Sequence, residues 1–317
     1  MNILLVAEQM LILFAMMFTG YLIFRLHWVT EEAAARLSSL VVNVFNPFLT
    51  ISSVFGKSIS STGFTFWENL ILVGLFYLIL FLTGLFLIVI LRPDSTQAPI
   101  FRLLTLLPNC GFMGIPVVSA LLGTDYVIYV AIYMLAYNII LYTYGIFLVD
   151  RSNPQPQMTK KEKQRTRYKK LRLILCNPGV ISAAIALIFF FGNVPVPEGV
   201  QKFCEYMGNP CVPLSMLLIG CSLAASHIPS MLKNIRLYGF ILVKMLALPI
   251  LCSFLTSLLP FDDNILRLFL IMLSMPAGSM VVLVTEEYGG QTECAASGVV
   301  LSTLASIVTI PIVSLFY

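Results

Sequence analysis

The chain has 317 residues, of which 59% are hydrophobic and only 11% are charged, and its mean hydropathy is +0.93. A typical soluble domain is about 45–50% apolar and about 25% charged, so this composition excludes a water-facing enzyme, a disordered chain and a small disulfide-stapled domain. A membrane β-barrel would alternate apolar and polar residues over strands of about ten residues. The apolar runs here are about twice that length, so the composition predicts an all-α polytopic membrane protein.

Ten apolar stretches are candidates for membrane spans, each of which takes about 20 mostly apolar residues as a helix. In chain order they lie at 3–24, 34–55, 66–91, 98–121, 125–149, 171–192, 199–224, 235–259, 265–285 and 294–316. The first stretch has neither a basic start nor a small-residue cleavage site, so we expect it to stay in the protein as a span rather than to act as a signal peptide.

The positive charges predict an orientation, because loops rich in Lys and Arg remain in the cytoplasm. Of the 19 Lys and Arg residues, Lys57, Lys202 and Arg267 fall in loops on one side of the ten stretches. Lys244 falls within a stretch, and all the others lie in loops on the other side. We therefore expect a multi-pass protein of the plasma (cytoplasmic) membrane with both termini outside.

The basic segment 150–170 is the one long hydrophilic stretch, and it divides the chain into residues 1–149 and 171–317. We interpret it as a solvated cytoplasmic linker rather than a nucleic-acid site. The two halves have matching special residues 166 to 168 positions apart, namely Pro47 and Pro213, Pro108 and Pro276, Gly123 and Gly289, and Thr143 and Thr309. Because each half has an odd number of spans, this pattern predicts two inverted five-helix repeats, which are typical of secondary transporters.

The fourth and ninth spans are interrupted at corresponding places, by LPNCGFMGIP at 107–116 and by MPAG at 275–278. Proline lacks an N–H and clashes with the preceding turn, although a simple kink is the alternative. Unwound backbone at membrane depth must line a polar cavity. A half-helix that begins there presents free N–H groups and a positive dipole end, which suit a carboxylate. We expect the two breaks to meet near the middle of the membrane.

Candidate substrate-binding residues lie at the breaks and on neighbouring spans. They are Asn46, Thr50, Pro108, Asn109, Cys110, Asn138, Tyr142, Pro276, Gly278 and Ser279. For each polar member the alternative is a hydrogen bond that only joins two helices. Lys244 and Glu287 are candidates for a charge or coupling role, and for Lys244 the alternatives are snorkelling and pairing with a carbonyl freed by Pro249.

Metal and catalytic motifs are missing from the sequence. The seven cysteines form no CxxC pair, and His27 and His227 lie far apart, so no zinc-binding spacing occurs. No P-loop, GxGxxG or GxSxG motif is present. We therefore expect no metal site, no cofactor and no enzymatic activity.

The motif at 107–116 resembles the auxin efflux carrier family, and IILYT at 139–143, MPAG at 275–278 and IPI at 310–312 resemble other helices of that family. The resemblance implies ten helices in two inverted repeats, with helices four and nine crossing at their prolines. It also implies a scaffold domain of helices 1, 2, 6 and 7, a transport domain of helices 3–5 and 8–10 that moves like an elevator, and often a homodimer. The family's Lys-Glu-Tyr after helix nine is Glu286-Glu287-Tyr288 here, so a cationic role is not carried over to this position.

These observations predict a secondary transporter of a small organic anion, either a carboxylate or an auxin-like molecule, with the lipid bilayer as its other partner. One alternative is a sodium-coupled symporter of the bile-acid type, in which Glu287 and Gln291 could contribute to an ion site. Another is a receptor or channel that does not act as a carrier. The substrate, the direction of transport, the coupling ion and the oligomeric state are left open by the sequence.

Overall fold

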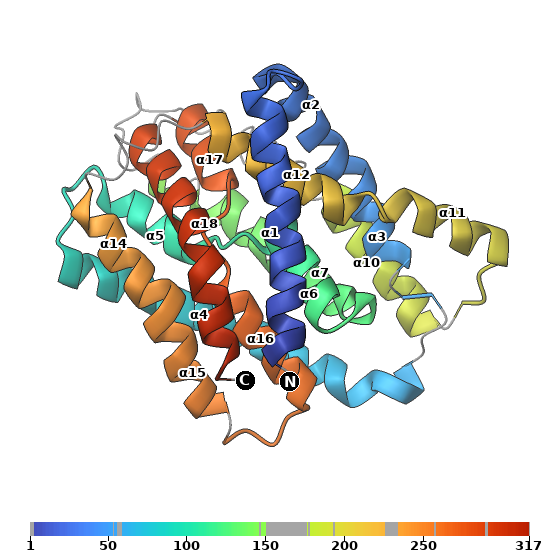
Figure 1. Cartoon of the computed structure of the whole chain (residues 1–317). Coiled ribbons are helices and arrows are strands. Elements are labelled where there is room, and N and C mark those ends of the chain that lie inside the picture. Colours follow the sequence, from blue (N-terminus) through green and yellow to red (C-terminus); the bar gives the residue numbers. More distant parts are fainter. Residues whose placement is uncertain are drawn as a thin grey trace, which may run out of the picture.

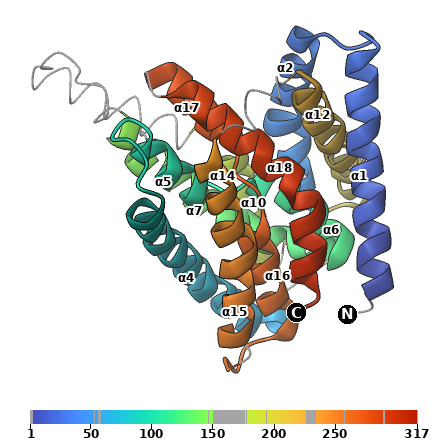
Figure 2. The same cartoon turned by 60° about the vertical axis from the view of Figure 1, so that its left-hand side comes forward.

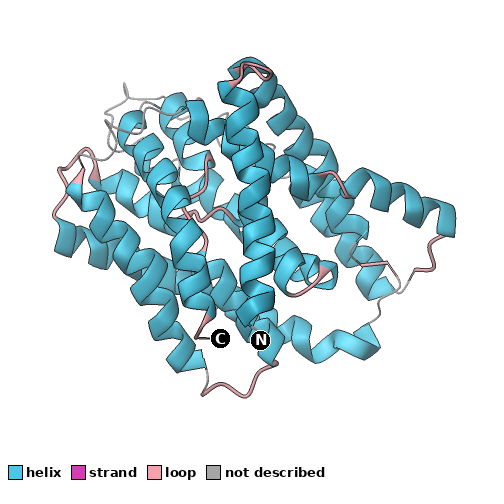
Figure 3. Cartoon of the chain, viewed as in Figure 1, coloured by secondary structure: helices cyan, strands magenta, loops and turns pink. Residues whose placement is uncertain are grey.

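The computed structural model in Figure 1 describes residues 3–52, 54–55, 59–145, 147–149, 176, 178–192, 194–225, 234–256, 258–288 and 291–316. Within these ranges the regular structure is helical, the helices are joined by turns and loops, and one isolated bridge occurs, as Figure 3 shows for the helices and loops. Helix is found in all ten apolar stretches. The basic segment 150–170 lies outside the described residues.

Six helical segments in the described part of the chain are long and apolar enough to cross a membrane. They are Glu31–Ser52, Thr65–Leu91, Thr124–Val149, Glu198–Ala225, Ile235–Thr256 and Thr292–Ser314. Shorter apolar helices cover Leu11–Arg25, Cys110–Leu121 and Pro178–Phe189. The chain is therefore an all-α, multi-pass membrane protein.

The helices of the first half run from α1 to η4. They are α1 (Ile3–Arg25), α2 (Glu31–Leu40), η1 (Val41–Phe45), α3 (Asn46–Ser52), α4 (Ile59–Leu91), α5 (Ala98–Leu106), η2 (Cys110–Gly114), α6 (Ile115–Leu121), η3 (Thr124–Tyr126), α7 (Val127–Ile140) and η4 (Leu141–Gly145). The second half has α10 (Pro178–Gly192), α11 (Glu198–Gly208), α12 (Cys211–Ala225), α14 (Ile235–Ile241), η5 (Leu242–Ala247), α15 (Leu248–Thr256), α16 (Asp263–Ser274), α17 (Met280–Tyr288) and α18 (Thr292–Ser314).

Three of these helices widen into a π-helical turn immediately before a proline. In each, the amide of the residue before the proline donates to the carbonyl five residues back: Asn46 to Val41, Ile115 to Cys110 and Leu248 to Val243. Proline has no N–H to donate to the preceding turn, and its ring clashes with the carbonyl oxygen of that turn. The helix accommodates the proline by widening one turn, in which the hydrogen bonds span five residues. The helix continues past Pro47, Pro116 and Pro249 without a full break.

Helix α1 lies along α12, and the two helices approach closely at a pair of glycines. A Cβ atom on Gly20 would lie 2.0 Å from the carbonyl oxygen of Leu217, and one on Gly220 would lie 1.9 Å from that of Met17. The Cys221 thiol donates to the Gly20 carbonyl across the same contact, at 3.4 Å. Figure 2 shows α1, α2 and α12 together at one edge of the molecule.

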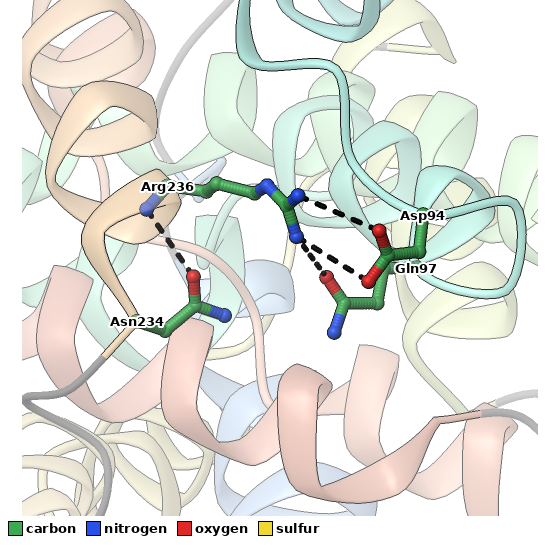
Figure 4. A network of polar contacts seen from close by, with 4 residues as sticks. All are labelled: Asp94, Gln97, Asn234 and Arg236. Carbon is green, nitrogen blue, oxygen red and sulfur yellow. Dashed lines mark hydrogen bonds and ion pairs between the residues drawn. The ribbon is translucent and has the colours of Figure 1, made fainter.

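On the other side of the molecule, α4, α5, α14, α15, α16 and α18 form a second group of helices (Figures 1 and 2). Arg236, at the start of α14, contacts the connection between α4 and α5 (Figure 4). The guanidinium of Arg236 lies 3.4 Å from the carboxylate of Asp94 and 3.3 Å from the amide oxygen of Gln97. The backbone N–H of Arg236 donates to the side-chain oxygen of Asn234. This network joins segments from the two halves of the sequence.

Candidate functional site

The break after α5 and the break between α16 and α17 pair with each other. The N–H of Asn109 donates to the carbonyl of Pro276 at 2.7 Å, and the N–H of Gly278 donates to the carbonyl of Leu107 at 2.8 Å. The two segments thereby form an isolated antiparallel β-bridge. The expectation that the two breaks meet is confirmed, and each break supplies hydrogen-bond partners that the other lost on unwinding.

Other polar groups of the breaks are satisfied locally. The N–H of Cys110 donates to the carbonyl of Pro108 at 2.8 Å, and the N–H of Ala277 donates to the hydroxyl of Ser302 on α18 at 3.1 Å. The side-chain oxygen of Asn109 accepts from the N–H of Phe112 at 3.1 Å. Asn109 is therefore the N-cap of the helix that continues through η2 and α6.

Three amide groups at the breaks keep their hydrogens free. Among the residues that the structure describes, the N–H groups of Gly111, Ser279 and Met280 donate no hydrogen bond within the chain. Gly111 lies in the first turn of the helix after the first break, and Ser279 and Met280 lie at the start of α17. Two helix N-termini, one from each half of the chain, thus retain donors and positive dipole ends beside the crossing.

A small cavity lies against this crossing. The space open to the centre of a water-sized sphere is about 80 Å³, and one water needs about 10–15 Å³ by this measure, so the cavity has room for several waters or one small molecule. The lining residues from the breaks are Pro108, Asn109, Cys110, Gly111, Phe112, Gly278, Ser279 and Met280. The remaining wall comes from Val41, Asn46, Met134, Tyr137, Asn138, Gly179, Cys211 and Ser215.

Two polar atoms in this wall are buried without a partner. The side-chain oxygens of Asn46 on α3 and Ser215 on α12 form no hydrogen bond within the described chain, although the residues are only 8% and 1% exposed. An unsatisfied buried polar group costs about 1–3 kcal/mol, which a bound ligand can offset. The Ser215 hydroxyl can donate, and a half-turn of the Asn46 amide exchanges its oxygen and nitrogen, so both side chains can donate to a carboxylate.

A larger cavity of about 360 Å³ adjoins the small one. The two cavities share Asn109, Phe112 and Ser279 in their walls. The larger cavity continues between α1, α2, α12 and α18 as far as Phe24 and Glu31, at the connection between α1 and α2. It therefore connects the crossing with one end of the molecule.

Seven of the residues predicted from the sequence line the small cavity: Asn46, Pro108, Asn109, Cys110, Asn138, Gly278 and Ser279. Pro276 belongs to the paired breaks, and Thr50 is buried in α3 outside the cavity lining. Tyr142 lies in η4 and Glu287 lies in α17, but their side chains are outside the described residues.

Lys244 lies in η5 and is fully buried. Its ammonium donates to the carbonyl of Met275, the residue immediately before Pro276. One alternative for Lys244 from the sequence was pairing with a carbonyl freed by Pro249. Lys244 does bond to a carbonyl outside a helical ladder, but that carbonyl belongs to Met275, at the break beside Pro276. The lysine packs directly against the crossing.

Some of the remaining lining residues are indicated by the sequence. Gly111 and Phe112 lie inside the motif that marked the first break, and Ser215 is a polar residue within an apolar stretch just after Pro213. Met134 and Val41 are ordinary apolar residues, so nothing in the sequence separated them from the rest of the core.

A multi-pass helical chain in which two interrupted helices meet beside a small cavity has the construction of a membrane transport protein. Residues 5–314 match the family described as membrane transport protein. The chain therefore belongs to this family, and the resemblance to the auxin efflux carriers is confirmed over nearly its whole length.

Three relatives match most of the chain. A protein of Rhizobium meliloti named "Putative malonate transporter" is 24% identical over 308 residues, which covers 94% of this chain and 91% of the relative. An uncharacterized transporter of Methanothermobacter thermautotrophicus is 21% identical over 310 residues and covers 96% of both chains. The mouse lysosomal cholesterol signaling protein is 22% identical over 315 residues, but only 35% of that longer protein is matched.

Proposed function

We propose that this protein is a secondary transporter that carries a small organic anion by alternating access. The observation that carries this proposal is the crossing of the two breaks, where the free N–H groups of Gly111, Ser279 and Met280 adjoin one small cavity. Backbone N–H groups at helix N-termini bind anions without a charged side chain. No Lys or Arg occurs among the described residues that line this cavity.

The size of the cavity and the few polar groups in its wall support a small carboxylate as the substrate. A volume of about 80 Å³ suits a molecule of a few heavy atoms better than a sterol or another large amphiphile. Asn46 and Ser215 offer polar groups on the wall opposite the breaks, and such groups fix the orientation of a ligand. The name of the Rhizobium meliloti relative, which refers to malonate, supports the same class.

The proposed mechanism uses two domains within ten membrane helices arranged as two inverted repeats, residues 1–149 and 171–317. The helices of the breaks belong to the proposed transport domain, whereas Asn46 on α3 and Ser215 on α12 belong to the proposed scaffold. The cavity thus lies between the two, where an elevator-like movement would carry the anion past the scaffold. The adjoining cavity toward Phe24 and Glu31 would be the cytoplasmic entrance.

The remaining parts of the proposal follow from the charge pattern and the family. The protein would lie in the plasma membrane as a homodimer, with both termini outside and the linker 150–170 in the cytoplasm. The alternative of a sodium-coupled symporter gains no support from the matching family or from the names of the relatives, none of which refers to sodium.

Uptake into liposomes tests the proposed function. Purified protein should take up labelled malonate in a saturable manner that an excess of unlabelled malonate suppresses, and Asn109→Ala should abolish this uptake. Substitution of the exposed Trp67 by Phe, outside the cavity lining, serves as the control. If a panel of small carboxylates enters liposomes that contain the protein no faster than it enters protein-free liposomes, the proposed function is wrong. If Asn109→Ala takes up malonate as fast as the wild type, the substrate does not bind at the proposed site.

A further inference from the structure

Lys244 is a charged residue inside the protein that the proposed site does not yet explain. Its side chain has no exposed surface. It lies on the widened turn η5, which connects α14 to α15 and packs against α16 and α18. Burying an ammonium without compensation is costly, so its retention at this place calls for a function.

The ammonium bonds to the crossing itself. It donates to the carbonyl of Met275, whose neighbour Pro276 accepts from Asn109 across the bridge. Met275 is 0% exposed and is the C-cap of α16, so its carbonyl points out of the helical ladder at the break. A carbonyl freed in this way needs a donor or a cation.

No acidic side chain among the described residues pairs with Lys244. Cys110 is a titratable side chain with which Lys244 interacts electrostatically. Cys110 also lines the small cavity, whereas Lys244 does not. The positive charge therefore lies behind the part of the cavity wall that Cys110 forms, in a low-dielectric region where it would stabilise an anion in the cavity.

Broken helices in other secondary transporters use freed carbonyls to coordinate a coupling metal ion. We propose that the Lys244 ammonium takes the place of such an ion: at the Met275 carbonyl it supplies the counter-charge for the bound anion and makes added sodium unnecessary. This inference rests on the proposed function of the same cavity. Lys244 acts as a positioning residue, through the backbone of the break and not by touching the substrate.

Three substitutions separate the hydrogen bond of Lys244 from its charge. Lys244→Gln can still donate to the Met275 carbonyl but has no charge, Lys244→Met has neither, and Lys244→Arg keeps both. Lys202→Gln is the matched control, because Lys202 is an exposed lysine paired with Glu198 far from the crossing. Each protein is purified, and its melting temperature is measured in sodium chloride and in choline chloride of equal concentration, with and without the choline salt of malonate.

The wild-type protein should melt at the same temperature in both salts, and malonate should raise that temperature in choline chloride. Lys244→Gln should melt above Lys244→Met in the absence of malonate, because it keeps the donor, but its apparent Kd for malonate should rise at least about tenfold. Lys244→Arg should retain part of the affinity, and Lys202→Gln should behave as the wild type. A purely structural lysine would not produce this separation of affinity from stability.

Two results would overturn the inference. The first is stabilisation of the ligand-free wild type by sodium over choline, which would place a metal ion at the break. The second is wild-type affinity for malonate in Lys244→Gln. Failure of every carboxylate to stabilise the wild type would instead contradict the proposed function, and the ligand-free comparison of Lys244→Gln with Lys244→Met would still test the contact with Met275.

Discussion

The N–H of Asn109 donates to the carbonyl of Pro276 at 2.7 Å, and this bond joins the two halves of the chain at their breaks. The same asparagine caps the following helix through its side chain and contributes to the walls of both cavities. One residue thus holds the crossing together and borders the space where we place the anion.

The substitution Asn109→Asp tests the role of residue 109 as a helix cap separately from its role in anion binding. Aspartate is as good an N-cap as asparagine, so the variant should still cap the helix, but its buried carboxylate, at a residue only 8% exposed, should lower the free energy of unfolding. Its carboxylate would repel an anion in the cavity, and malonate uptake should fall at least about tenfold, which corresponds to about 1.4 kcal/mol. Liposome uptake and thermal unfolding of the same preparation measure both effects, and wild-type affinity in Asn109→Asp would refute the anion assignment.

Gly278→Ala should damage the crossing. An added Cβ would lie 2.9 Å from the Tyr137 hydroxyl and 3.1 Å from the Leu107 carbonyl, so the bridge must shift, at a cost of about 1–3 kcal/mol, and uptake should be lost. Gly74→Ala is the matched control, since nothing lies within 4 Å of the added atom on the exposed face of α4. That control should gain up to about 1 kcal/mol, whereas equal unfolding temperatures for both variants would contradict the close approach.

Ser215→Ala should weaken binding without weakening the fold. The Ser215 hydroxyl is buried and unpartnered, so its removal should leave the free energy of unfolding unchanged or raise it by about 1 kcal/mol, while the affinity for malonate falls. Thr309→Val removes another unpartnered buried hydroxyl, on α18 outside the cavity lining. Titrating malonate against both variants checks the difference, and equal affinities would exclude Ser215 from the site.

Asp94→Asn should have a small effect that depends on salt. The side chains of Arg236 and Asp94 are 33% and 65% exposed, and exposed ion pairs contribute about 0–1 kcal/mol. We expect a loss of that size in low salt, which disappears near 1 M salt, where the screening length is about 3 Å. The melting temperature measured at both salt concentrations tests this, and a large loss at high salt would mean that the network in Figure 4 is structurally essential.

Composition and local pattern were sufficient to predict the helical membrane class, the positions of the apolar helices and the two breaks. The prolines at 108 and 276 mark the breaks, because a missing N–H and a ring clash act on the chain wherever the residue occurs. The π-helical turns before Pro47, Pro116 and Pro249 obey the same local rule, although they were not predicted from the sequence.

The partners of the breaks were decided by the tertiary structure. Which carbonyl accepts from Asn109, which hydroxyl meets Ala277 and which ammonium reaches Met275 depend on residues far away in the sequence. The sequence by itself determined that this chain is a membrane protein with two interrupted helices, because hydropathy and proline geometry are local properties. Only the packed fold decided that Ser215, Met134 and the break amides share one cavity and that Lys244 lies behind it, because burial and neighbours arise when distant helices meet.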